Sequence, residues 1–377
     1  MSKNGLVELR KKRSVSPDAR RLPDLSLGLP SEPDELMALV EAEATLGELR
    51  GELRARPRYI AEGALRRLSF KEAAAYLNVT ADWIHPCDLS LRAMGTTKSV
   101  VSSLRSGGFS LSLPVTFSSD LQVPYNKSAA WASIVDRHVE IGIFLARSLE
   151  RIWRGTFEYG HSLPYSERLR FPEFDEAKNP LNLGRFSELM DAMLTLGDSG
   201  DAHPSVWRTH AFGGMWRSQE LKTGGFVASA FGRLVLALNA VFFGPEKGPW
   251  VLPWLSRLPQ RYCRVDAAFD LFLDMPARRK VWFQAVRDAA RDAMATLGAL
   301  QDVAEFIANH PKFRDTKFRT KLIEAIMRDG VATVGSIARS CDMSKQTALF
   351  GLVTLEKEGI VREMTGKVRN RVWSCVF

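Results

Sequence analysis

Two short groups of residues near the carboxyl end of the chain carry side chains that can bind nucleic-acid bases and phosphates. The first group is Ser344-Lys345-Gln346-Thr347, and the second is Lys367, Arg369 and Arg371. A glutamine can form two hydrogen bonds with the edge of an adenine, and a lysine can reach a guanine or a phosphate. Arginines on a nearby loop can bind the phosphate backbone or the minor groove. These residue types favour contact with double-stranded DNA.

The elements predicted around both groups are those of a winged helix-turn-helix. Apolar residues recur at helical spacing in three successive segments, and Ser344 is a suitable N-cap for the third. Alternating residues then flank the turn Gly366-Lys367 and predict a hairpin. In such a module the third helix enters the major groove with its first turn at the bases, and the hairpin forms the wing. The predicted helices span 317–329, 333–340 and 344–358, and the predicted strands span 360–365 and 371–376.

Three apolar residues leave a second interpretation of this module open. Leu349, Phe350 and Val353 lie on the flanks of the third predicted helix, where a DNA-binding helix often carries charge. Phe350 could contact a thymine methyl group, or Phe350 and Val353 could form a surface for a second subunit. A winged helix that binds only proteins is therefore the alternative to one that binds DNA.

Positive charge is concentrated at the two ends of the chain. Residues 311–377 contain 13 Lys or Arg against 7 Asp or Glu, and residues 1–21 contain 7 against 2. The chain of 377 residues has a formal net charge of +9, so the residues between the two ends are nearly neutral. Positive charge on a small terminal domain suits phosphate binding, whereas the first segment could also be a solvated tail.

Length and periodicity predict three regions. A chain of 377 residues is too long for one compact core. Residues 1–32 contain three prolines and a basic run but no apolar periodicity, which predicts a flexible basic arm. Residues 33–310 are mostly of helical periodicity and predict a helical body, and residues 311–377 are the winged helix. The expected fold class is therefore mainly α with a small β-hairpin.

Within the body, the apolar pattern predicts several helices. One begins at Ser31, a second runs from Tyr59 to Leu68 or as far as Leu77, and residues 277–309 form one or two more. Residues 226–243 are apolar nearly all round, which is typical of a central, buried helix. A further helix is expected at 131–153.

The cysteine content and the hydropathy of the chain indicate the cell compartment in which we expect the protein. The 4 cysteines are scattered and form no C-x-x-C pair, which argues against a zinc site and against a disulfide framework. No apolar run approaches the ~20 residues that span a bilayer, and the amino-terminal segment lacks the apolar stretch of a signal peptide. We expect a reduced, cytoplasmic protein that binds no metal, no cofactor and no membrane.

Two further segments favour structural roles. His203 and His210 are seven residues apart, but no carboxylate or cysteine accompanies them at metal-ligand spacing, so we expect structural histidines. Residues 68–80 are similar to the helix-turn-helix of excisionase-type proteins. Pro86 interrupts the segment before a recognition helix could form, which favours a helical hairpin of the body.

The carboxyl-terminal residues 337–373 resemble the winged helix that follows the catalytic domain of many bacterial Fic (filamentation-induced-by-cAMP) proteins. Residues 39–57, 231–243 and 266–294 are similar to helices of the same family. The chain is most similar to a Fic-like helix-turn-helix family of unassigned function in rhizobia and their relatives. Residues 85–92 carry that similarity, as do the glycines and arginine of 216–234. The resemblance implies a Fic-derived helical body.

The residues that would carry Fic catalysis are missing. A Fic enzyme has the motif H-x-F-x-[D/E]-G-N-G-R, in which the histidine is the general base and the turn holds nucleotide phosphates. Here Gly225 occupies the histidine position, Ser229 the acid position and Phe231 the asparagine position, and only Gly232 and Arg233 match. The resemblance therefore implies a lost catalytic site, with no catalytic residue and no cofactor.

These observations predict a DNA-binding regulator of transcription, or of a plasmid or mobile element. Its winged helix would read double-stranded DNA, and its body would serve oligomerisation, as a homodimer, or sensing of a protein or small-molecule effector. Two alternatives remain: an enzyme with altered Fic chemistry or a nucleotide in the old cleft, and a protein-interaction adaptor.

Overall fold

The computed structural model describes about half of the helical body and most of the winged helix. Predictions for residues 1–29 of the basic arm, for His203, for the helix at 226–243 apart from the buried, helical Val235, and for the degenerate catalytic motif at 225–233 lie outside the described residues. Of the predicted helix at 131–153, residues 139, 142–143 and 145–153 are described and helical. The described residues are 30–79, 84, 86–93, 139, 142–143, 145–154, 205–220, 235, 251–264, 267–268, 270–313, 316–364 and 371–375.

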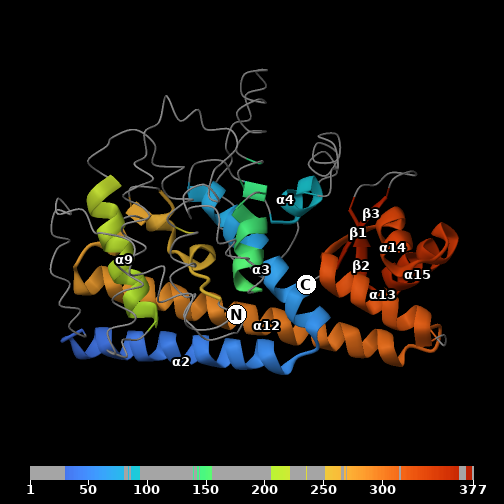
Figure 1. The fold of residues 1–377 in the computed structure, drawn as a ribbon, viewed down its shortest axis with the longest axis horizontal. Coiled ribbons are helices and arrows are strands. Elements are labelled where there is room, and N and C mark those ends of the chain that lie inside the picture. Colours follow the sequence, from blue (N-terminus) through green and yellow to red (C-terminus); the bar gives the residue numbers. More distant parts are fainter. Residues whose placement is uncertain are drawn as a thin grey trace, which may run out of the picture.

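This part of the chain is mainly α-helical and ends in a small antiparallel sheet, which confirms the predicted fold class (Figure 1). The body helices are α2 (Pro33–Ala55), α3 (Arg58–Val79), α4 (Pro86–Ala93), α9 (Ser205–Glu220) and α12 (Pro276–Asn309). Three short 3-10 helices lie between them, η2 (Leu255–Arg257), η3 (Gln260–Tyr262) and η4 (Asp270–Phe272). The last part contains α13 (Thr316–Asp329), β1 (Val331–Thr333), α14 (Val334–Cys341), α15 (Lys345–Lys357), β2 (Val361–Glu363) and β3 (Val372–Cys375).

The helices α2 and α12 lie side by side in the same direction along one edge of the body (Figure 1). Each begins with a proline in its first turn, where the missing N–H costs no helical hydrogen bond. Apolar residues of both helices form the long seam between them, including Leu39, Leu46 and Leu49 of α2. The prediction of one or two helices at 277–309 resolves into the single α12 of 34 residues.

Ion pairs fix the register of α2 against α12. Arg279 donates to the buried Glu35 through two nitrogens, one of them at 2.9 Å, and this hydrogen bonding raises the pKa of Arg279. The guanidinium of Arg279 also lies 5.5 Å from the ring of Trp207 on α9. Further along, Arg287 pairs with Glu41 at 2.6 Å. A slip of either helix by one residue would leave Glu35, which is 1% exposed, as an unpaired buried charge.

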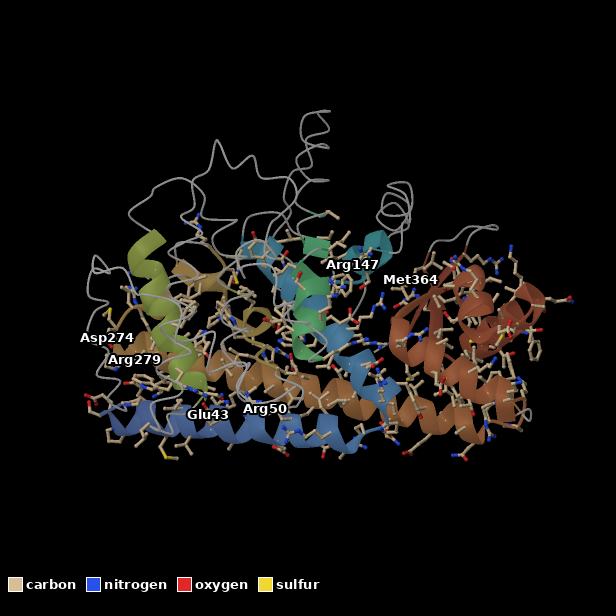
Figure 2. All side chains as sticks on the ribbon, in the orientation of Figure 1. Glu43, Arg50, Arg147, Asp274, Arg279 and Met364 are labelled. Carbon is tan, nitrogen blue, oxygen red and sulfur yellow. The ribbon has the colours of Figure 1, made fainter. Side chains whose placement is uncertain are left out.

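Two other carboxylates, the buried Glu72 and the half-buried Glu43, cap helix starts. Glu72 of α3 accepts the backbone N–H groups of Trp254, Leu255 and Ser256 at 2.8 to 3.0 Å, and so holds η2. Glu43 of α2, labelled in Figure 2, accepts the backbone N–H of Val206 and, at 2.9 Å, the hydroxyl of Ser205 at the start of α9. Burial raises the pKa of both carboxyl groups. These caps satisfy N–H groups that a helix start leaves without internal partners.

His210 lies in an aromatic cluster between α9 and α12. Its Nε2 is 2.8 Å from the Leu271 carbonyl oxygen, and its ring stacks on Trp207 with the centroids 6.1 Å apart. Phe272 and Trp282 contact the ring from other sides. The prediction of a structural histidine is confirmed for His210 by its burial and its hydrogen bond.

The body and the winged helix meet where α3 crosses α13. A β-carbon at Gly63 would overlap the carbonyl group of Met327, so glycine is required for this close approach. One turn later, Arg67 donates to the carbonyl oxygens of Met327 and Ile326 and, at 3.1 Å, of Gly63. Carbonyl oxygens in the last turn of a helix lack N–H donors within the helix, and Arg67 supplies donors to them.

One buried apolar core connects the body with the winged helix, from Ala38 of α2 to Trp373 of β3. The predicted boundary at residues 310 and 311 falls at the end of α12, where His310 and Lys312 both lie against Glu358 at the end of α15. The division of the chain into two domains at this boundary stays a prediction. Among the described helices, none combines the length and the apolar character needed to cross a membrane.

We predict that His210 makes the protein less stable in mild acid. Burial lowers the pKa of His210 from its ordinary 6.5 to about 4. Between these two values the unfolded chain binds a proton that the folded protein excludes, so the stabilisation is complete above pH 6.5 and is lost as the pH falls. Urea unfolding at pH 7.5, 6.5 and 5.5 should show the onset of this loss of unfolding free energy, which reaches about 3 kcal/mol at pH 4. In His210→Gln, whose amide can still reach Leu271, this component should be absent; an unchanged pH dependence would contradict the assignment.

We predict that Gly63→Ala separates α3 from α13. The added methyl group cannot coexist with the Met327 carbonyl, and such overpacking costs about 1–3 kcal/mol. Gly47→Ala on α2 is the matched control, because nothing lies within 4 Å of the new carbon and alanine is the better helix former. Denaturant unfolding should therefore show a lower free energy of unfolding for Gly63→Ala, and an unchanged or higher one for Gly47→Ala. Equal stability of both variants would exclude the close contact.

Candidate nucleic-acid interface

The order of elements from α13 to β3 is that of a winged helix-turn-helix. Three helices and the strands follow as helix, strand, helix, helix, strand, strand, and the sheet has the order β1-β3-β2. Both strand pairs are antiparallel, with Trp373 opposite Ala332 on one side and Glu363 on the other. The sequence predicted the three helices and the hairpin, but β1 was missed because three residues carry too little alternation to be recognised.

The short helix α14 is fixed by a reciprocal cap. The Thr333 hydroxyl accepts the backbone N–H of Ser336 at 2.9 Å, and the Ser336 hydroxyl accepts the N–H of Thr333 at 2.8 Å. Thr333 is therefore the cap of α14 and not its first residue, as the sequence had suggested. Thr333 also ends β1, so the capping box joins the helix directly to the sheet.

A tight turn leads from α14 to the recognition helix α15. Asp342 adopts the left-handed conformation with φ of 51°, which an aspartate tolerates better than most residues. The Ser344 hydroxyl then accepts the N–H of Thr347 at 3.1 Å, as predicted for the N-cap of α15. The Thr347 hydroxyl is hydrogen-bonded to the Ser344 hydroxyl at 2.8 Å. Both side chains are exposed, and their hydrogen bond stabilises the turn before α15.

Close packing orients α15 against α13. A β-carbon at Gly351 would lie 3.1 Å from the side chains of Leu322 and Phe318, so the two helices approach closely there. Ala348, Leu352 and Leu355 form the rest of the buried face of α15. With this face buried, the first turn projects outward, and Lys345, Gln346 and Thr347 are all exposed.

Glu356 connects the end of α15 with the strands of the wing. Its carboxylate accepts the indole N–H of the buried Trp373 at 3.2 Å and the backbone N–H of Glu363 at 3.3 Å. Arg371 lies directly before β3 and is half-buried. Lys367 and Arg369 at the predicted tip of the wing lie outside the described residues, so their DNA contacts stay predictions.

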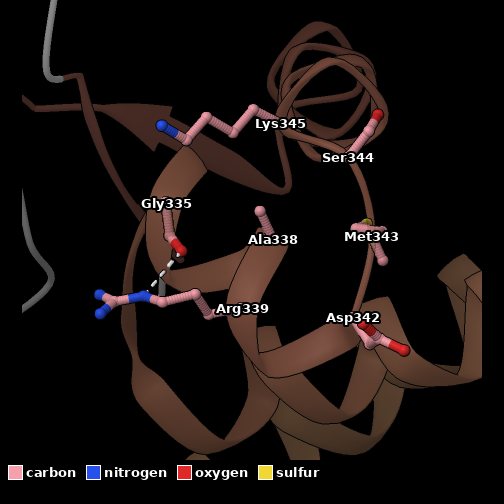
Figure 3. Close-up of a pocket in the computed structure, with 7 residues that line it drawn as sticks. All are labelled: Gly335, Ala338, Arg339, Asp342, Met343, Ser344 and Lys345. Atoms are coloured by element: carbon pink, nitrogen blue, oxygen red, sulfur yellow. Dashed lines mark hydrogen bonds between the residues drawn. The ribbon is translucent and has the colours of Figure 1, made fainter.

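Arg339 is a candidate phosphate contact that the sequence analysis missed. It lies on α14, is exposed, and donates to the Gly335 carbonyl oxygen at 3.2 Å. Figure 3 shows Arg339 and Lys345 extending toward the same side of an open groove, whereas Asp342 lies on the other side. The turn between α14 and α15 brings Arg339 and Lys345 to the same groove, and their spacing in the sequence does not predict this. The groove is lined by Gly335, Ala338, Arg339, Asp342, Met343, Ser344 and Lys345.

The geometry defines a winged helix with an exposed, positively charged first turn of the recognition helix. No model of a known protein family matches the chain, and no curated protein is significantly similar to it. The Fic-like origin of the body therefore stays a prediction. Within the residues that the structure describes, no group of three or more His, Cys, Asp or Glu could hold a metal ion.

We predict that Ser344 stabilises α15 mainly through its cap. Ser344→Ala should lower the free energy of unfolding by about 1 kcal/mol, because the N–H of Thr347 loses its acceptor. Ser344→Asp should restore stability, since aspartate caps equally well, while its negative charge should weaken DNA binding. Denaturant unfolding and a DNA titration on the same preparations separate the two effects. A stable alanine variant would show that the cap contributes nothing.

Proposed function

We propose that this protein binds double-stranded DNA through its winged helix and acts as a regulator of transcription, or of a plasmid or mobile element. The observation that carries the proposal is the exposed first turn of α15, with Lys345 and Gln346 projecting and Arg339 beside them. The helix start adds the partial positive charge of its unpaired N–H groups. Phosphates and base edges are the groups that such a surface binds.

The body is proposed to hold the recognition helices in a fixed geometry. The contacts of Gly63 and Arg67 with α13 attach the winged helix closely to α3. Two copies of the chain joined through their bodies would present two recognition helices at a defined spacing, as a palindromic operator requires. The homodimer and any effector of the body are parts of this proposal.

Point substitutions test the proposal better than removal of the winged helix. Truncation after Lys312 would uncover the faces of α3 and α12 that α13 covers, and loss of binding would then not be specific. Lys345→Ala should weaken binding to duplex DNA and reduce the slope of log affinity against log salt by about 1. Arg291→Ala is the charge-matched control, because Arg291 is an exposed cation on α12 of the body. Fluorescence anisotropy with a mixed-sequence duplex at two salt concentrations provides the measurement.

The expected result is salt-dependent binding by the unmodified protein and by Arg291→Ala, with weaker binding by Lys345→Ala. If the unmodified protein shows no salt-dependent affinity, the proposal is wrong. Binding that persists unchanged in Lys345→Ala would assign the contact to another surface, such as the basic amino-terminal residues.

A protein-interaction adaptor is the second candidate, and one observation favours it. Leu349 and Phe350 of α15 are 39% and 55% exposed, which is unusual for large apolar side chains on a helix that faces the charged backbone of DNA. An adaptor of this kind would bind its partner without the salt dependence that phosphate contacts impose.

A further inference from the structure

The outward face of α15 has a composition that restricts which DNA it can read. Opposite the buried face, the residues at three- and four-residue spacing are Gln346, Leu349, Phe350, Val353 and Lys357. Polar side chains stand only at the two ends of this face, and its middle is apolar. Leu349 and Phe350 flank the line from Gln346 to Lys357 on either side.

An apolar middle disfavours G·C pairs in the major groove. Guanine presents two acceptors there and cytosine presents an amino donor. Leu349, Phe350 and Val353 offer these groups no hydrogen-bond partner, so burial against them would cost the desolvation of each group. Thymine instead presents a methyl group at the same edge, and its burial against an aliphatic or aromatic side chain is favourable.

The charges at the ends of the face suit DNA better than an apolar protein surface. Lys345 at the start and Lys357 at the end of α15 are both exposed, and they border the apolar middle. The phosphates of two strands border the major groove in the same way. An apolar protein partner would have to desolvate both ammonium groups without compensation.

The length of the helix sets the spacing of the contacts. Gln346 and Phe350 are four residues apart, which is about 6 Å along the helix axis. One base pair occupies about 3.4 Å of duplex, so the two side chains meet groups roughly two base pairs apart. Gln346 is suited to the N6 and N7 edge of adenine.

We infer that α15 reads A·T-rich DNA, with a thymine methyl group packed against Phe350 and Leu349 about two base pairs from an adenine bound by Gln346. This inference rests on the proposed function, and it names the DNA chemistry that the same site recognises. The recognised group is the methyl on C5 of a pyrimidine, so 5-methylcytosine should also be preferred over cytosine.

The test compares duplexes that differ only in that methyl group. The probes are alternating duplexes of deoxyadenosine with thymidine or with deoxyuridine, and mixed-order G·C duplexes with cytosine or 5-methylcytosine. The full chain should bind the thymidine duplex several times more tightly than the deoxyuridine duplex, since one buried methyl group corresponds to about a fourfold change in affinity. The full chain should likewise bind the 5-methylcytosine duplex more tightly than the duplex with unmethylated cytosine.

Phe350→Ala should remove most of this preference and leave the salt dependence of binding unchanged. Met37→Ala is the matched control, because Met37 is 58% exposed on α2 of the body and Phe350 is 55% exposed. Leu349→Ala is the second variant on the recognition helix. Thermal unfolding of each variant checks that the fold is kept, as the exposure of these side chains leads us to expect.

Equal affinity of the unmodified protein for the thymidine and deoxyuridine duplexes, with salt-dependent binding to both, would overturn the inference and leave the proposed function standing. A methyl preference that survives in both Phe350→Ala and Leu349→Ala would also overturn it. If Phe350→Ala lowers the mass of the protein in solution and leaves the methyl preference intact, the apolar face is a subunit surface and the inference is wrong. Absence of binding to every duplex would instead reject the proposed function.

Discussion

The carbonyl group of Met327 occupies the space in which a side chain at position 63 would begin, and this shared space determines where the winged helix sits. Arg67 closes the same contact by donating to the last carbonyls of α13. From α13 the constraint passes to α15, because Leu322 packs against Gly351. From α15 it passes to the wing through Glu356. The helix α15 is thus positioned by a series of short contacts that begins in the body.

Buried charge is the second constraint on the fold. Glu35 and Glu72 are buried and Glu43 is half-buried, so an unpaired carboxylate at any of these positions would be unfavourable. Each is matched by a guanidinium or by backbone N–H groups at a helix start. These pairings are specific in a way that apolar contacts are not, since a shifted helix would still bury leucines but would lose the partner of its carboxylate. The polar contacts therefore select one register among many that apolar burial alone would allow.

Local patterns in the sequence were sufficient for α2, α3, α12, the three helices of the winged helix and the cap at Ser344, because these depend on residues within a few positions of each other; they did not predict α4 and α9. They were sufficient for the structural role of His210 as well, since it lacks nearby ligands. They could not indicate the importance of Gly63 and Arg67, whose partners lie about 260 residues later. Arg339 was missed for the same reason, because its proximity to Lys345 depends on the turn at Asp342. The short strand β1 was missed because it is defined by its pairing with β3 and not by its own composition.

The pairing of α2 with α12 has a consequence for how the chain folds as it is made. Lys280 and Arg287 bind partners that precede them by 246 residues. The helix α2 is therefore synthesised long before α12, the helix against which it packs. At translation rates of about 5–20 residues per second, this interval is roughly 10 to 50 seconds. Before α12 emerges, α9 is the described helix that contacts α2 most, so the leucines on the inner face of α2 stay largely uncovered. The native seam between α2 and α12 can therefore form only when the carboxyl-terminal third of the chain has emerged.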